Sequence, residues 1–159
     1  MREGTAQVWT EYHQFFVRDQ SSHVGVPVRE LAGLAGVIGD GGLVIFTGIA
    51  IGTVTVTWIS HEGSPPPEIE GWDDVVEVVA DAPRGRWFLT GFDGGSVDDV
   101  NLLSQGPRSY TVRVSARGRD AVWDGEGQST EEIHLDVWPT PAGGTERVLK
   151  AGSAIAGWS

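Results

Sequence analysis

A strict alternation of apolar and polar residues, repeated in three segments, constrains the fold of this chain more than any other feature. Residues 53–59 place a valine or tryptophan at every second position, with threonines between them. Residues 109–116 and 131–138 show the same period of two. Because successive side chains of a β-strand point to opposite faces, each segment predicts a strand with one face in a core. No stretch of the sequence shows the period of a long amphipathic helix.

Aromatic and β-branched residues indicate further strands. Residues 8–18 predict the first strand of the chain. Residues 43–47 and 52–59 are joined through glycines, which predicts a hairpin or a β-bulge between them. The valine-rich run 72–81 predicts a strand that pairs with residues 86–90 across a turn containing proline.

These elements together predict an all-β protein, an antiparallel β-sandwich with at most one short helix. Residues 29–35 are the candidate for that helix, although nearby glycines weaken it. The length of 159 residues suits one domain. We expect residues 1–141 to form a single β-sandwich domain, followed by a Gly/Ala-rich C-terminal tail, residues 142–159, which could add a strand.

The negative charge of the chain is unevenly distributed. The formal net charge is −11, and residues 61–100 carry ten carboxylates against two arginines. A field of one sign attracts basic partners and repels nucleic acid and anionic lipid. The sequence therefore predicts a basic protein partner, with neither nucleic acid nor a membrane as a partner.

The acidic region also suggests the residues that would contact such a partner. We expect its carboxylates to share one exterior patch, where they steer the partner and bind its arginines and lysines. A tryptophan within the region would act as an aromatic anchor. The predicted partner-binding residues are Glu68, Glu70, Trp72, Asp73, Asp74, Glu77 and Asp81.

The sequence contains no recognisable catalytic or metal-binding motif. It has no cysteine, no Gly-x-Ser-x-Gly elbow and no His-x-His pair, and His134 is interpreted as isolated on the polar side of its strand. We therefore predict no catalytic residue, no metal and no cofactor in a non-enzymatic protein. A His–carboxylate pair in a cleft would favour an enzyme instead. The absence of cysteine and of an apolar N-terminal segment predicts a cytoplasmic location.

A short motif near the start of the chain resembles a known family. Residues 11–17, Glu-Tyr-His-Gln-Phe-Phe-Val, resemble the opening strand of the competence protein J family of nuclease inhibitors. The resemblance implies an all-β inhibitor that occupies the basic cleft of a nuclease and protects its producer. The leading functional hypothesis is accordingly an immunity protein or inhibitor that binds a basic partner such as a nuclease toxin. We interpret the motif as a core strand, so it identifies no binding residue.

The seven tryptophans support an alternative, a carbohydrate- or ligand-binding β-sandwich module. Trp58 and Trp87 lie within strand-like runs and are expected in the core. Trp72, Trp123 and Trp158 lie near turns or the terminus and are the candidates for an exposed sugar platform. The sequence leaves the identity of the partner and the oligomeric state open.

Overall fold

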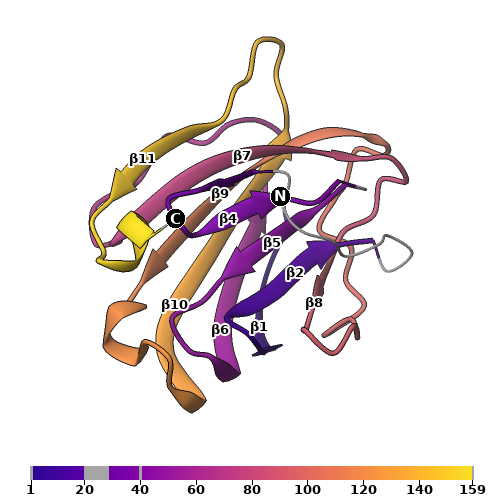
Figure 1. Cartoon of the computed structure of the whole chain (residues 1–159). Coiled ribbons are helices and arrows are strands. Elements are labelled where there is room, and N and C mark those ends of the chain that lie inside the picture. Colours follow the sequence, from indigo (N-terminus) through magenta and orange to yellow (C-terminus); the bar gives the residue numbers. More distant parts are fainter. Residues whose placement is uncertain (1, 20–28, 40, 159) are drawn as a thin grey trace.

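The computed structural model of the chain is an all-β protein whose two sheets pack around a shared core (Figure 1). It describes residues 2–19, 29–39 and 41–158. Within these residues the larger sheet has the order β1 (Arg2–Thr10), β6 (Ile51–Ser60), β10 (Glu126–Pro139), β9 (Arg108–Arg117), β7 (Asp74–Ala82) and β11 (Arg147–Ala151). The smaller sheet has the order β3 (Arg29–Leu31), β4 (Ala35–Val37), β5 (Leu43–Phe46), β2 (Gln14–Arg18) and β8 (Phe88–Thr90).

Strand pairing is antiparallel throughout the described residues except between β6 and β10, which run parallel with Val56 opposite Ile133. Two short 3-10 helices, Asp120–Val122 (η1) and Ile155–Trp158 (η2), accompany the strands. Neither of these turns, nor any other part of the chain that the structure describes, forms a helix long and apolar enough to cross a membrane.

The alternating segments place their apolar faces in the core, as predicted. The core side chains of β6, β9 and β10 are buried: Val54, Val56, Trp58, Tyr110, Val112, Val114, Ile133, Leu135 and Val137. The opposite face of β9 is covered rather than solvated. Arg113 on that face is buried because the chain after β6 crosses it, and its guanidinium donates to the carbonyl oxygens of Pro65 and Pro66 at 2.9 and 3.2 Å.

Three predicted strand arrangements are wrong. Residues 8–18 do not form one strand, because a turn separates β1 in the larger sheet from β2 in the smaller sheet. The strands β5 and β6 are not a hairpin, since they too belong to different sheets. The strand β7 pairs with β9 and β11 rather than with β8, which pairs with β2. In each case the turn carries the chain across to the other sheet, and turn residues alone do not encode that crossing.

The predicted short helix at residues 29–35 is also wrong. This segment forms β3, a three-residue turn and the start of β4. Ala32 and Gly33 at the centre of the turn have φ of 52° and 56°, and the Leu34 amide donates to the Leu31 carbonyl oxygen at 2.9 Å. Two consecutive left-handed residues define the turn type that hairpins prefer, and glycine at the second position favours it over a helix.

The C-terminal segment packs against the sheets. The strand β11 pairs antiparallel with β7 at the edge of the larger sheet, opposite the end occupied by β1. In Figure 1 it is the yellow strand beside β7, with η2 at its end. Ile155 is 5% exposed, so this segment adds both a strand and a buried side chain to the sandwich.

Candidate functional site

The turn between β1 and β2 adopts a conformation that its residues disfavour. Tyr12 and His13 have φ of 52° and 62°, and the backbones of Glu11 and Gln14 exchange hydrogen bonds of 3.0 and 3.3 Å across them. Hairpin turns of this kind prefer Asn-Gly, and a left-handed conformation costs an ordinary residue roughly 1–2 kcal/mol. Such strain persists only where the surrounding structure holds it, and it tends to occur at functional sites.

Contacts made by His13 hold the turn in place. Its Nδ1 lies 3.1 Å from the Thr47 carbonyl oxygen and its Nε2 lies 3.1 Å from Asp124 Oδ1. Its ring stacks on Trp123, with the centroids 4.4 Å apart. A carbonyl oxygen and a carboxylate only accept hydrogen bonds, so each contact depends on an N–H of the His13 ring.

A hollow of about 240 Å³ lies beside this turn, and we call it the Tyr12–Trp123 pocket. Its lining residues include the aromatic residues Tyr12, Phe46 and Trp123 and the acidic residue Glu30. Tyr12 is 75% exposed and Trp123 is 40% exposed. In the described part of the chain, four of the five non-glycine residues with left-handed φ lie in or next to this pocket: Tyr12, His13, Ala32 and Asp124.

A buried polar network, which we call the Arg119 network, fixes the walls of the pocket. Arg119 is fully buried and donates to the carbonyl oxygens of Gly33 and Phe46 at 2.7 and 3.4 Å. It also donates to Asp74 Oδ2 at 2.6 Å, and this carboxylate is fully buried as well. The network therefore ties the β3–β4 turn and the end of β5, both in the smaller sheet, to β7 in the larger one.

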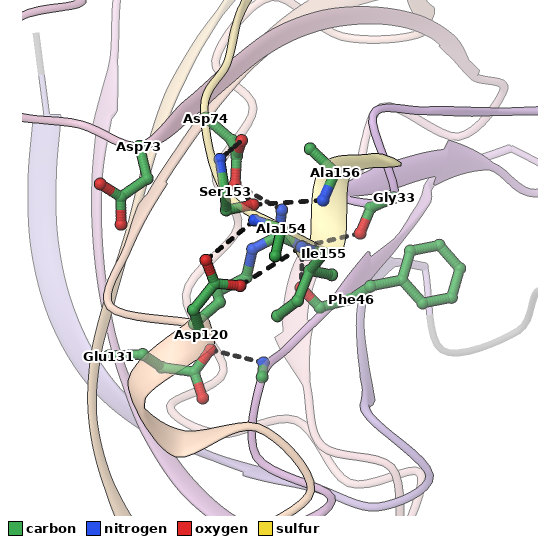
Figure 2. A network of polar contacts seen from close by, with 12 residues as sticks. Gly33, Phe46, Asp73, Asp74, Asp120, Glu131, Ser153, Ala154, Ile155 and Ala156 are labelled. Atoms are coloured by element: carbon green, nitrogen blue, oxygen red, sulfur yellow. Dashed lines mark hydrogen bonds and ion pairs between the residues drawn. The ribbon is translucent and has the colours of Figure 1, made fainter. Parts of the chain in front are cut away.

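The same network holds the C-terminal segment, as Figure 2 shows. Asp74 accepts hydrogen bonds from the Ser153 hydroxyl and amide at 2.6 and 3.1 Å. Asp120 accepts from the amides of Ala154 and Ile155 at 2.8 and 3.3 Å (Figure 2). Burial acts to raise the pKa of the Asp74 carboxyl, but the hydrogen bonds from Ser153 and Arg119 outweigh it and lower that pKa below its ordinary value.

Glu131 completes the network from β10. It is 1% exposed and accepts hydrogen bonds from the backbone amides of Gly48 and Ile49 at 2.8 and 3.0 Å. These contacts fix the loop after Phe46, which lines the pocket. The pocket is thus assembled from segments far apart in the sequence.

Two of the predicted partner-binding residues are buried, so their placement on an exterior patch is wrong. Asp74 is paired with Arg119 in the network above. Glu77 is 4% exposed and accepts from Arg113 Nε at 2.9 Å and from Arg147 Nε at 2.8 Å. The neutralising arginines are Arg113, Arg119 and Arg147, which come much later in the sequence. They lie on or next to β9 and β11, the strands that flank β7 in the sheet.

The other predicted residues are at least partly exposed but do not gather in one patch. Glu68, Glu70 and Asp81 are exposed, whereas Trp72 and Asp73 are half-buried. Asp73 precedes β7 and Asp81 lies near its far end, so they are roughly 26 Å apart at about 3.3 Å per strand residue. The acids at 93–99 follow β8 in the other sheet. The mid-chain charge is therefore spread over the molecule.

Sequence reasoning also missed a cluster on the outer face of the larger sheet. Asp136 Oδ1 accepts hydrogen bonds from His61 Nε2 at 2.8 Å and from His134 Nε2 at 3.2 Å. Burial acts to raise the pKa of Asp136, but the bonds from His134 and His61 prevail and lower it. His134 is thus not isolated. His134 and Asp136 are two residues apart on one strand, so their side chains point to the same face of the sheet. This spacing could have predicted the contact from the sequence.

This cluster lines a hollow of about 320 Å³ that also contains Trp72. The second ring nitrogen of His134 lies 2.6 Å from Thr57 Oγ1, so the His–carboxylate pair that would favour an enzyme is present here, with both ring nitrogens of His134 hydrogen-bonded. The arrangement cross-links β6, β10 and the segment after β6. Within residues 2–19, 29–39 and 41–158, no group of three or more His, Asp or Glu side chains is arranged to hold a metal ion.

The tryptophan predictions have mixed outcomes. Trp58 and Trp87 are 3% and 1% exposed, which confirms them as core residues, and Trp123 is exposed as predicted. Trp72 is half-buried, with the Arg117 guanidinium 4.5 Å from its ring centroid and the His134 ring stacked at 6.2 Å. The side chain of Trp158 lies outside the described residues.

Comparisons with known proteins give one similarity. No protein-family model matches the chain, and no curated protein matches it. A solved structure titled "Crocagin biosynthetic gene J" is similar with a TM-score of 0.52 and 16% identity, over 89% of this chain and 100% of that one. At this identity the similarity shows a shared fold and nothing about activity. It does not bear on the resemblance to the competence protein J family, which stays a prediction.

Proposed function

We propose that this protein is a non-enzymatic binding protein of the cytoplasm, an immunity protein or inhibitor that holds a basic partner such as a nuclease toxin. The observation that carries the proposal is how the chain uses its own charges. Six described arginines form ion pairs within the chain and share only four carboxylates, Asp19, Asp74, Glu77 and Glu132. Most acidic residues are left for the exterior.

The described exterior is correspondingly negative. Its exposed carboxylates are Glu3, Glu30, Glu62, Glu68, Glu70, Asp81, Asp93, Asp98, Asp99, Asp120, Asp124, Glu126 and Glu132. An overall field of this kind accelerates encounters with a cationic protein even without a single dense patch. The cleft of a nuclease is basic because it binds phosphates, which fits the inhibitor role that the sequence resemblance implies.

The carbohydrate-binding alternative has less support. The ring of Trp72 is in contact with Arg117 and His134, and that of Trp123 stacks on His13. A sugar platform needs an open aromatic face. The two contacts of Trp72 obstruct its ring, whereas the side chain of Trp123 retains 40% exposure.

Inhibition of DNA cleavage tests the proposal. The chain is titrated into a panel of purified basic endonucleases, with equally basic proteins that lack nuclease activity as binding controls. We expect stoichiometric inhibition of at least one endonuclease and binding that weakens as salt rises. The proposal is wrong if no endonuclease is inhibited, or if binding to the endonucleases equals binding to the control proteins at every salt concentration.

A further inference from the structure

We propose that the Tyr12–Trp123 pocket receives the guanidinium group of an arginine side chain presented by the partner. This inference rests on the proposed function and deepens it, because it identifies where the partner is anchored and by which side chain. It also assigns a role to the strained turn, which no sequence motif predicted.

The walls of the pocket combine the two features that guanidinium groups bind. The rings of Tyr12 and Trp123 are the exposed aromatic surfaces, and a guanidinium stacks on such rings. Glu30, on the edge strand β3, is exposed and lines the same pocket. A carboxylate accepts two parallel hydrogen bonds from the planar guanidinium fork.

Charged groups around the pocket favour a cation. Glu11 flanks Tyr12 in the sequence, and Asp124 adjoins Trp123. The ring of His13 already contacts Asp124, with Nε2 3.1 Å from Asp124 Oδ1. Arg119 lies behind the wall, where its two terminal nitrogens donate to Asp74 and to backbone carbonyls. Glu30 is exposed and forms no ion pair with the other described side chains.

Size and rigidity point to a single side chain as the occupant. A volume of about 240 Å³ accommodates one long side chain but not a helix or a strand. The strained turn and the Arg119 network brace the backbone from which Tyr12, Gly33 and Phe46 line the pocket, which reduces the entropy lost on association. Lysine presents a point charge without a planar face, so it should bind more weakly than arginine.

Titration with small analogues tests the inference without a protein partner. The 15N-labelled chain is titrated with the Nα-acetyl amides of arginine, lysine and citrulline, and the indole N–H signal of Trp123 is followed by NMR. The arginine compound should shift this signal saturably, and it should bind about tenfold more tightly than the lysine compound. Citrulline has the same shape without the charge, and it should not saturate.

Matched variants locate the site. Trp123→Ala and Glu30→Gln should each weaken binding of the arginine compound about tenfold. Trp9→Ala removes an equally exposed tryptophan outside the pocket (41% against 40%), and Glu62→Gln removes an exposed carboxylate elsewhere. Both controls should bind as the unaltered chain does. Since Trp123 supports His13, Glu30→Gln provides the test if Trp123→Ala fails to fold.

The inference is overturned if the arginine and citrulline compounds bind equally, if neither saturates, or if Trp9→Ala weakens binding as much as Trp123→Ala. These outcomes are separate from those of the nuclease experiment. Endonuclease inhibition that survives Glu30→Gln and Trp123→Ala would retain the proposed function and reject the pocket as its anchor. Saturable arginine binding without inhibition of any endonuclease would retain the pocket as an arginine site and reject the proposed function.

Discussion

Removing the charge of Arg119 should destabilise the protein more than any other single arginine substitution. In Arg119→Met, the carboxylate of Asp74 stays fully buried and keeps only its bonds from Ser153. The carbonyl oxygens of Gly33 and Phe46 lose a buried donor as well. Breaking a buried ion pair from one side costs about 3–5 kcal/mol, against a total stability of about 5–15 kcal/mol for a typical domain.

An exposed pair of the same chemistry provides the matched control. Arg117 and Glu132 approach to 2.7 Å, almost the 2.6 Å of the Arg119–Asp74 pair, but their side chains are 44% and 52% exposed. Glu132→Gln should therefore cost less than about 1 kcal/mol, because solvent screens the pair. Urea unfolding followed by tryptophan fluorescence measures both changes. Equal losses in the two variants, or a loss below about 1 kcal/mol for Arg119→Met, would refute the role assigned to the buried network.

Three further predictions concern the stability of the protein at acidic pH, the strained turn between β1 and β2, and the close contact between Gly48 and the backbone of Arg119. The pKa of Asp136 is lowered on folding, so its ionised form adds stability above its unfolded pKa of about 3.9, and this contribution is lost as pH falls through the folded pKa. Asp136→Asn should lower the free energy of unfolding at pH 7 and make it fall less steeply below about pH 4. Unfolding followed by circular dichroism at a series of pH values measures this. An unchanged pH dependence below about pH 4 would contradict the prediction. Tyr12→Asn should raise the free energy of unfolding by about 0.5–1 kcal/mol, because asparagine tolerates left-handed φ. The same substitution should weaken binding of the arginine compound. A loss of stability would count against strain in the turn. A Cβ on Gly48 would lie 2.1 Å from the Arg119 carbonyl oxygen, so Gly48→Ala should lower the thermal midpoint, and an unchanged midpoint would mean that the loop is not held closely.

The local features of this fold were predictable from the sequence. Alternation fixed the inward faces of β6, β9 and β10, because a period of two depends only on neighbouring residues. Strand partners were not predictable in the same way. The glycines between β5 and β6 indicated a turn, but whether that turn returns within one sheet or crosses to the other depends on packing between distant segments.

The candidate site escaped prediction for a related reason. Tyr12 and His13 carry no turn signature, because the interactions that stabilise their turn come from Thr47 and Asp124, which lie 34 and 111 residues from His13. Charge density along the sequence was misleading as well. Asp73 and Asp81 lie near opposite ends of one strand, and Asp74 between them is neutralised by an arginine 45 residues later in the chain.

The association rate of the chain with an endonuclease that it inhibits, measured by stopped-flow fluorescence across ionic strength, tests the central claim most directly. If the acidic exterior captures a basic partner, the rate should fall about tenfold or more between 20 mM and 300 mM salt, and Glu68→Lys combined with Glu70→Lys should reduce that dependence. A rate that stays constant across this range, in the unaltered chain and in the variant alike, would contradict the account.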